Sequence, residues 1–190
     1  MNTLMHICCA PCANRPIDAL RQEGVGVTGF WFNPNIHPYT EYQARKATLE
    51  GYAREIGMKL VIGGTYDLRT FVTHVADNID GRCAYCYRVR MEETARYAAE
   101  HGFDSFTTSL LISPYQKHEA IAAAARAMGE KYGVPFLYRD FRPMFQAGQD
   151  FARKHGFYMQ KYCGCIFSEE DRYMAQKRKK AARRAAAAGQ

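Results

Sequence analysis

Short stretches rich in β-branched and aromatic residues alternate with longer segments of helical periodicity along this 190-residue chain. Such alternation is typical of a parallel sheet covered by helices, because each parallel crossover accommodates a helix. It predicts an α/β fold, a parallel-sheet α/β sandwich with a helical C-terminal part. Strands are predicted over residues 3–8, 25–32, 58–62, 104–109 and 135–138. Helices are predicted over residues 15–23, 39–56, 68–76, 83–101 and 117–131.

The length of the chain predicts one α/β domain, residues 1–174, followed by a basic, alanine-rich tail, residues 175–190. Six of the seven net positive charges lie in residues 177–190, which contain no acidic residue. The tail can extend a helix or remain solvated, and its charge would attract phosphates in a salt-dependent way. The nearly neutral body predicts only modest attraction for phosphate. No apolar run of 18 residues is present, so no membrane span is expected.

Seven cysteines fall into three tight groups, and this is the pattern that points to chemistry. The groups are Cys8, Cys9 and Cys12, then Cys83 and Cys86, then Cys163 and Cys165. A thiolate is both a nucleophile and a soft metal ligand. An iron–sulfur cluster needs about four thiolates, and the first two groups supply five. The pattern favours a redox metalloprotein.

Two other uses of clustered cysteines compete with this interpretation. A disulfide scaffold is typical of small secreted domains, but no hydrophobic signal segment precedes Cys8 and seven thiols cannot all pair. A structural zinc site formed by Cys9, Cys12, Cys83 and Cys86 fits the spacing. Zinc leaves Cys8 and the CGC sequence unexplained. The free thiols predict a reducing compartment, the cytoplasm.

The CGC sequence differs from the other two groups because Gly164 lets the backbone bend tightly between its cysteines. Cys163 and Cys165 can then form a small, strained disulfide, which is easily reduced and suits a reversible electron relay. Two further metal ligands or two inert thiols are the alternatives.

Polar segments follow four of the predicted strands directly, namely CCAPC, FNPNIHP, SPYQKH and RDFRP. Ligands of open α/β sheets bind beyond the carboxyl ends of the strands, so these segments are expected to meet at one rim. Asparagine and proline also form rigid turns, and Glu41 and Arg45 can simply pair along a helix. The candidate substrate-binding residues are Asn33, Asn35, His37, Tyr115, Gln116 and His118.

Five motifs in one order, CCAPC, FNPNIHP, CAYCYRVRMEETA, TTSLLISPYQKHEAI and QKYCGC, resemble those of the QueH-type epoxyqueuosine reductases over residues 5–173. The resemblance implies two-electron reduction of the epoxide of epoxyqueuosine, at the wobble position of tRNA, to queuosine and water. This is the last step of tRNA queuosine biosynthesis, carried out here without cobalamin. The implied fold is the nucleotide α-hydrolase (Rossmann-like) type.

The resemblance also implies a division of labour among the cysteines. Cys8, Cys9, Cys83 and Cys86 would hold a 4Fe–4S cluster, and Cys163 with Cys165 would form a redox-active disulfide. Cys12 is then a candidate ligand of an additional mononuclear iron, which would activate the epoxide oxygen while the cluster and the CGC sequence deliver electrons. The expected partners are the anticodon loop of the tRNA and an electron donor that the sequence does not identify.

A third, weaker alternative is an ATP-using tRNA sulfur-transfer enzyme of similar fold. Such an enzyme needs a glycine-rich phosphate loop after the first strand. This chain has CCAPC there instead.

Overall fold

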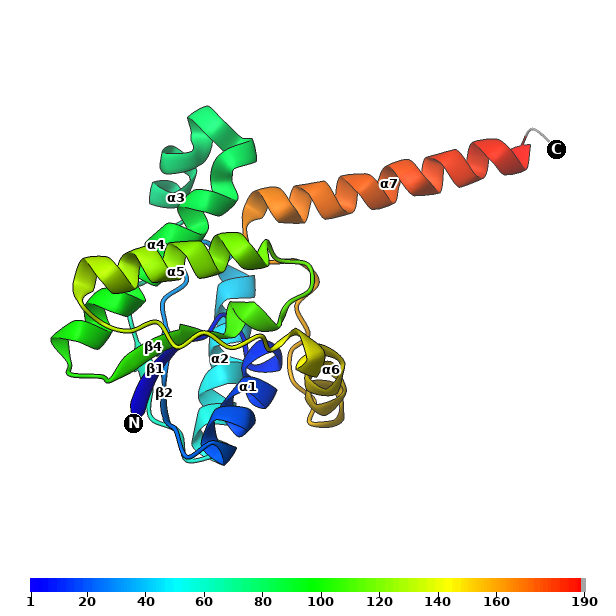
Figure 1. The fold of residues 1–190 in the computed structure, drawn as a ribbon. Helices are drawn as coiled ribbons and strands as arrows, with labels where there is room; N and C mark the ends of the chain where they lie inside the picture. The colour runs from blue at the N-terminus through cyan, green and yellow to red at the C-terminus, as the bar shows by residue number, and fades with distance from the viewer. Residues whose placement is uncertain (189–190) are drawn as a thin grey trace.

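The computed structural model describes residues 1–188, and it contains one fully parallel sheet (Figure 1). Its strands are β1 (Asn2–His6), β2 (Gly26–Trp31), β3 (Leu60–Ile62) and β4 (Ser105–Thr108). They lie side by side in the order β3-β2-β1-β4. The predicted α/β fold with a parallel sheet is therefore confirmed.

Seven α-helices and three short 3₁₀ helices lie between the strands and after the last strand within the described residues. The α-helices are α1 (Ala10–Gln22), α2 (Tyr39–Glu55), α3 (Leu68–Val75), α4 (Arg82–Glu100), α5 (His118–Tyr132), α6 (Phe145–Lys154) and α7 (Ile166–Ala188). The 3₁₀ helices are η1 (Ala76–Gly81), η2 (Ser109–Ile112) and η3 (Arg142–Met144).

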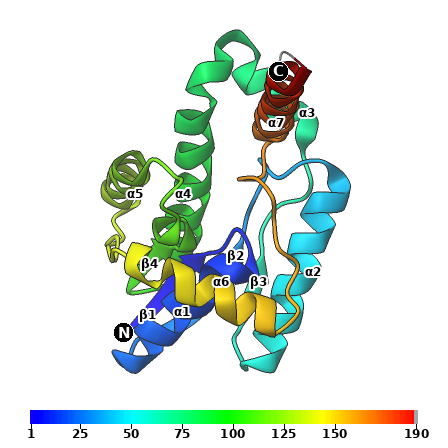
Figure 2. The ribbon, with the colours of Figure 1, turned by 90° about the vertical axis from the view of Figure 1, so that its right-hand side faces the viewer.

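Helices cover both faces of the sheet, with α2 on one side and α4 and α5 on the other (Figure 2). Residues pointing to either face of the central strands are consequently buried, as Leu4, Met5, Phe30 and Trp31 show. This is the burial expected of a parallel sheet in an α/β protein. The arrangement leaves the loops at the carboxyl ends of β1, β2 and β4 to build a site.

Two predicted elements differ from the structure. The strand predicted over residues 135–138 is reduced to an isolated bridge between Phe106 and Phe136. Pro135 has no backbone N–H, so it can only accept a hydrogen bond, from Phe106 N. The first helix begins at Ala10 rather than near residue 15, with Pro11 in its first turn. Proline is well suited there because the first N–H groups of a helix have no partner within it.

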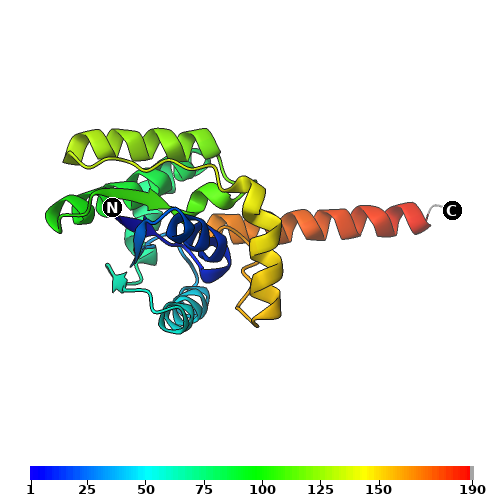
Figure 3. The ribbon, with the colours of Figure 1, turned by 60° about the horizontal axis from the view of Figure 1, so that its bottom comes forward.

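Helix α7 projects away from the rest of the molecule (Figures 1 and 3). It runs without a break across the boundary predicted between the α/β domain and the basic tail. No helix among the described residues combines the length and apolar content that crossing a bilayer requires.

Candidate active site

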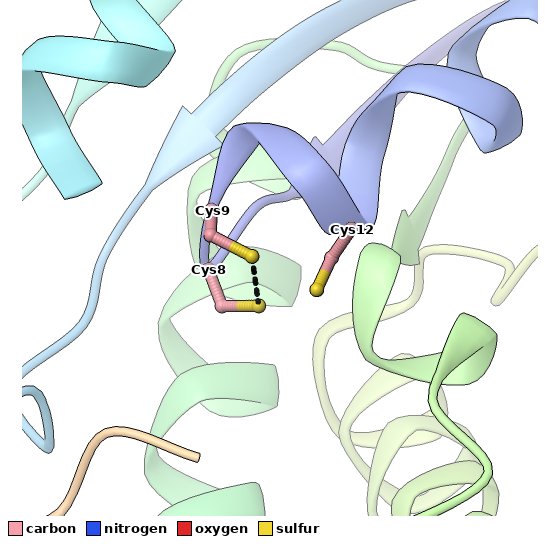
Figure 4. A group of neighbouring side chains, drawn as sticks. All are labelled: Cys8, Cys9 and Cys12. Carbon is pink, nitrogen blue, oxygen red and sulfur yellow. Dashed lines mark hydrogen bonds between the residues drawn. The ribbon is translucent and has the colours of Figure 1, made fainter. Parts of the chain in front are cut away.

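Three cysteines gather where β1 gives way to α1 (Figure 4). Cys9 is the residue before the helix and has an extended backbone, while Cys12 lies in the first turn. The three Sγ atoms all lie within 4.8 Å of one another, and those of Cys8 and Cys9 are 3.7 Å apart. All three side chains are buried. Buried sulfur atoms this close form a group that can bind a soft metal.

The thiols of this group share protons unequally. Hydrogen bonds from Cys12 and Cys9 hold the pKa of Cys8 well below its ordinary value. Burial raises the pKa of Cys9 well above its ordinary value. The group thus accommodates one negative charge on its own, and a bound cation would favour deprotonation of the other thiols.

Gln160 directs its side-chain amide at two of these sulfurs. Its Nε2 lies 3.0 Å from Cys9 Sγ and 3.3 Å from Cys12 Sγ. An N–H group is a donor, so this contact favours thiolates over thiols.

The second group lies in the first turn of α4, where Cys83 is half-buried and Cys86 is buried. Burial raises the pKa of Cys86 to about 11. Arg90, one turn further on, is only 2% exposed. It donates from Nη2 to Cys86 Sγ at 3.0 Å and from Nε to Cys86 O at 3.1 Å.

The surroundings of Arg90 indicate whether a thiolate metal ligand fits at Cys86. Among residues 1–184, whose side chains the structure describes, no carboxylate pairs with its guanidinium. A buried charge without a counter-ion is strongly unfavourable. Deprotonation of Cys86, which metal ligation imposes, supplies that counter-ion. The surroundings of Cys86 therefore fit a metal-bound thiolate.

The third group lies in an irregular segment between α6 and α7, residues 158–165, which we call the strap. Arg45 of α2 donates to the carbonyls of Tyr162 and Cys163 at 2.9 Å and 3.2 Å. Glu41 accepts from Arg45 Nε at 2.7 Å and also from the hydroxyl of Tyr158. The buried Glu41–Arg45 pair therefore does more than join two turns of a helix: it fastens the strap to α2.

Gly164 is where the strap bends, with φ of +131°. A Cβ atom at this position would lie 3.1 Å from Ile36 Cγ1 and 3.4 Å from Arg45 Nη1. The carbonyl of Gly164 accepts a hydrogen bond of 2.8 Å from His37 N. Glycine is required here both by the backbone conformation and by the close approach of neighbouring side chains.

Cys163 is exposed and Cys165 is buried, and both are free thiols in this structure. Hydrogen bonding from Cys165, reinforced by Ser168, lowers the pKa of Cys163 to about 5. The pKa of Cys165 is raised because its proton is shared with Cys163. The lowered pKa of one thiol and the raised pKa of the other favour a thiolate at Cys163 beside a protonated Cys165, and the pair is a reduced dithiol here. The Cys163–Cys165 disulfide stays a prediction.

A cleft of about 550 Å³ brings the three groups together. Its wall includes Cys8 and Cys12, Cys83 and Cys163, while Cys86 and Cys165 line a smaller pocket that shares walls with it. Segments following β1 and β4 contribute to the wall, as the rim of a parallel sheet predicts. Of the four segments predicted to meet, those after β1 and β4 reach the cleft and FNPNIHP reaches the smaller pocket through Asn35, whereas no residue of RDFRP is among the described lining residues of either pocket.

The cleft is basic. Its described lining residues include no carboxylate, and six are cationic: Arg45, Arg82, Lys117, Arg153, Lys161 and Arg172. Three of these cations, Arg45, Arg82 and Arg153, form ion pairs with Glu41, Asp171 and Asp150, which are not among the lining residues. The modest attraction for phosphate expected of the nearly neutral body stays a prediction.

The structure places the predicted substrate-binding residues that follow β4 at different depths. Tyr115 is 86% exposed at the wall of the cleft. Gln116 lines the cleft as well and accepts a hydrogen bond of 2.7 Å from the hydroxyl of Tyr87. His118 is buried and lies 3.0 Å from the hydroxyl of Tyr138, away from the described walls of both pockets.

The predicted residues that follow β2 are all buried. Asn35 lines the smaller pocket, and its Oδ1 has no partner among the described residues. Asn33 donates to Ile7 O at 2.9 Å, and His37 Nε2 lies 3.0 Å from Pro34 O. Asn33 and His37 therefore brace the loop, and neither is among the described lining residues of the two pockets.

Sequence reasoning missed several residues of the site. One signal could have found Arg90: it follows Cys86 by four residues, so a helical interpretation of that segment places both on one face. Lys117 lies near the middle of the chain and Arg172 near its C-terminal end, and only the fold brings them to one cleft.

Comparison with solved structures supports the fold. A structure described as a predicted subunit of tRNA methyltransferase from Methanocaldococcus jannaschii aligns with a TM-score of 0.51, covering 83% of this chain and 89% of the other. At 12% sequence identity this likeness concerns the fold alone. It agrees with the parallel-sheet α/β sandwich described above.

Comparison with known sequences identifies the family. The family profile described as "Epoxyqueuosine reductase QueH" matches residues 3–171. A relative from Dehalococcoides mccartyi with this name is 37% identical over 90% of this chain and 93% of its own. Relatives of the same name from Thermotoga maritima and Haemophilus influenzae are 34% and 33% identical, over 88% and 71% of their own lengths. The chain belongs to the epoxyqueuosine reductase QueH family.

Proposed function

We propose that this protein reduces the epoxide of epoxyqueuosine, at the wobble position of tRNA, to queuosine and water. Family membership supports the reaction. The observation that carries the proposal to this chain is the basic cleft, in which thiols of all three groups meet. A basic cleft suits a polyanionic substrate, and thiols suit a reduction.

In this proposal Cys8, Cys9, Cys83 and Cys86 hold a 4Fe–4S cluster, and Cys12 binds an additional mononuclear iron; no cobalamin takes part. The closeness of the first three sulfurs and the buried Arg90 beside Cys86 support this ligand set. When bound, these iron centres supply one-electron transfer and a Lewis acid.

Cys163 and Cys165 supply reducing equivalents in this proposal. Conversion of an epoxide to an alkene and water consumes two electrons and two protons. Oxidation of a dithiol to a disulfide releases the same number of each, so one turnover of the pair balances one reduction. Exposure of Cys163 lets an external reductant restore the dithiol.

The RNA is held by its charge and by stacking. Single-stranded RNA loops are usually recognised by splayed bases that stack on aromatic side chains. Tyr115 is exposed at the cleft wall for this role, with Gln116 beside it. Asn35 offers an unpartnered oxygen in the smaller pocket. Asn33, His37 and His118 contribute by holding the loops in place. We assign the protein to the cytoplasm, where such thiols stay reduced.

Turnover of the Cys163→Ser variant tests the proposal. The protein is purified without oxygen and given tRNA containing epoxyqueuosine and a chemical reductant, and its nucleosides are analysed by mass spectrometry. The variant should lose multiple turnover while it keeps its iron, sulfide and visible absorption. Cys8→Ser is the matched comparison, because it should lose the absorption too. Full multiple turnover by Cys163→Ser would remove the CGC sequence from the mechanism.

Metal analysis of the same preparation tests the cofactor separately. About four irons and four sulfides per chain are expected for the cluster, and a fifth iron would support the role of Cys12. Zinc without sulfide after anaerobic reconstitution would contradict the redox proposal.

A further inference from the structure

We propose that residues 177–184 of α7, which we call the basic arm, bind the phosphate backbone of the RNA whose modified base enters the cleft. The identity of this RNA rests on the proposed function. The arm itself rests on the geometry and charge of α7.

The side chains of the basic arm lie in solvent rather than against the rest of the protein. Residues 170–184 are all exposed, and α7 extends outward from the rest of the protein (Figures 1 and 3). Within residues 1–184 none of its cationic side chains forms an ion pair. The arm does not contribute to the core, so its charges are available to a partner.

The residue types in the arm indicate what kind of partner it can bind. Six of its eight residues are lysine or arginine, the other two are alanine, and no acidic residue interrupts them. Successive helical residues are turned by about 100°, so Lys177, Arg178 and Lys179 point in three directions. The arm has no apolar face to place on another helix or in a bilayer. Charge on all sides suits a polyanion.

The position of α7 connects the arm to the site. Ser168 and Arg172, near its start, line the cleft. Asp171 forms an ion pair of 2.5 Å with Arg82, and the Arg82 guanidinium lies 5.8 Å above the ring of Phe167. These contacts fasten the base of α7 to the start of α4. At 1.5 Å per residue the arm ends about 18 Å beyond Arg172.

That distance suits the backbone flanking a base held in the cleft. Cations of the cleft contact the nucleotides nearest the reacting base, and the arm continues the positive surface along the adjoining stem. Contacts of this kind carry no sequence information and orient the RNA.

The test compares salt dependence of RNA binding between two variants of the full chain. In one, all six cations of the arm become glutamine, which preserves helical propensity. In the other, the three lysines become arginine, which preserves the charge. Affinity for unmodified tRNA is measured by fluorescence anisotropy between about 50 and 200 mM KCl, a range in which phosphate contacts dominate.

The glutamine variant should bind at least about tenfold more weakly at the low-salt end, and its salt slope should fall by about 0.7 to 0.9 for each phosphate that the arm no longer neutralises. The arginine variant should match the natural chain. An unchanged slope and affinity in the glutamine variant would overturn the proposal. So would binding of phosphatidylserine vesicles that depends on the arm while tRNA binding does not. Failure of the natural chain to reduce the epoxide would count against the proposed function and leave this result intact.

Discussion

At the scale of single residues, Gln160 is placed to tune two candidate metal ligands at once. Its amide donates towards Cys9 and Cys12 at 3.0 Å and 3.3 Å. Hydrogen bonds to the sulfurs of an iron–sulfur centre help to set its reduction potential. Gln160→Leu removes the donor and keeps the approximate size of the side chain. We expect the potential to become more negative, because the reduced, more anionic state loses stabilisation. A redox titration followed by electron paramagnetic resonance measures this shift.

Gln149→Leu is the matched control, since Gln149 lines the same cleft and makes no described hydrogen bond to a cysteine. Its potential should equal that of the unmodified protein. Equal potentials in both variants would show that Gln160 does not act on the metal centre.

Cys163 should react as a thiolate in mildly acidic solution, because its pKa is lowered to about 5. Its rate of alkylation by iodoacetamide should rise with pH through about 5 and then level off. An ordinary cysteine reaches that plateau only above its pKa of about 8.5. The reaction is followed by mass spectrometry of the peptide that contains residue 163, with Cys163→Ser as the control. A plateau reached only above pH 8 would contradict the prediction.

The same pKa has a consequence for stability. A thiol whose pKa is lower in the folded state stabilises the fold fully above its unfolded-state pKa, and this contribution fades as pH falls through the folded value. Between pH 8 and pH 5 the free energy of unfolding should therefore decrease more in the unmodified protein than in Cys163→Ser. Parallel decreases would show that Cys163 has no such role.

Individual residues were predictable from the sequence to different degrees. Cysteine spacing was sufficient to nominate Cys8 and Cys83 for a metal site, because the chemistry of thiols restricts their uses. The resemblance to the QueH-type reductases then joined Cys163 to the same mechanism. Arg90 was not predicted, since its meaning depends on burial and on the absence of a carboxylate partner, and neither can be read from residue types alone.

At the scale of elements, the strap depends on α2 for its position. Arg45 binds the carbonyls of Tyr162 and Cys163 through two separate nitrogens. Lysine keeps the charge next to Glu41 but lacks the planar fork that reaches both carbonyls. Arg45→Lys should therefore loosen the strap and leave the rest of the sheet unchanged. Amide hydrogen exchange in residues 158–165 should accelerate at least about tenfold, which corresponds to roughly 1.4 kcal/mol of local stability.

Arg54→Lys is the control for this variant, because Arg54 lies on the same helix and is exposed. Its exchange pattern should match that of the unmodified protein. Unchanged exchange in Arg45→Lys would mean that other contacts, such as His37 N to Gly164 O, suffice to hold the strap.

Helices and strands were predicted correctly where the local sequence pattern determines them. Four strands and the helices between them follow from hydrophobic periodicity, and α4 begins within one residue of its predicted start. The start of α1 was placed too late, because Pro11 was taken as part of a turn although it also suits a helix start. The strand predicted at residues 135–138 failed, since pairing with β4 is decided by tertiary contacts. The course of the strap follows from tertiary contacts as well.

At the scale of the whole molecule, the cleft joins α1, α4, α7 and the strap, which are far apart in the sequence. Metal ligation by the cysteines at the β1–α1 junction and in α4 would cross-link two segments that are far apart in the sequence. Binding free energy of this kind adds to folding free energy. Loading the metal should therefore raise the Tm of the whole protein, and chelation should lower it.

Substitution of Arg90 tests how metal binding and folding stability depend on each other. In the metal-free protein the raised pKa of Cys86 keeps its thiol neutral, so the sulfur to which the buried guanidinium donates carries no charge. Arg90→Met should then stabilise the metal-free protein by roughly 1–3 kcal/mol. In the metal-bound protein the same substitution removes the counter-ion of a thiolate, and it should lower both the Tm and the amount of iron retained. The Tm of Arg90→Met should therefore be higher than that of the unmodified protein without metal and lower with metal. Calorimetry of the two forms measures both differences.

Arg88→Met is the control for this variant, since Arg88 lies on the same helix in an exposed ion pair with Glu92. Such pairs contribute less than about 1 kcal/mol, so both forms should change little and in the same direction. If Arg90→Met lowered the Tm equally with and without metal, Arg90 would be a packing residue, and the case for a thiolate at Cys86 would lose its main structural support. If only Arg90→Met changes the Tm in opposite directions with and without metal, the effect of this buried charge on the stability of the whole protein depends on whether the metal is bound.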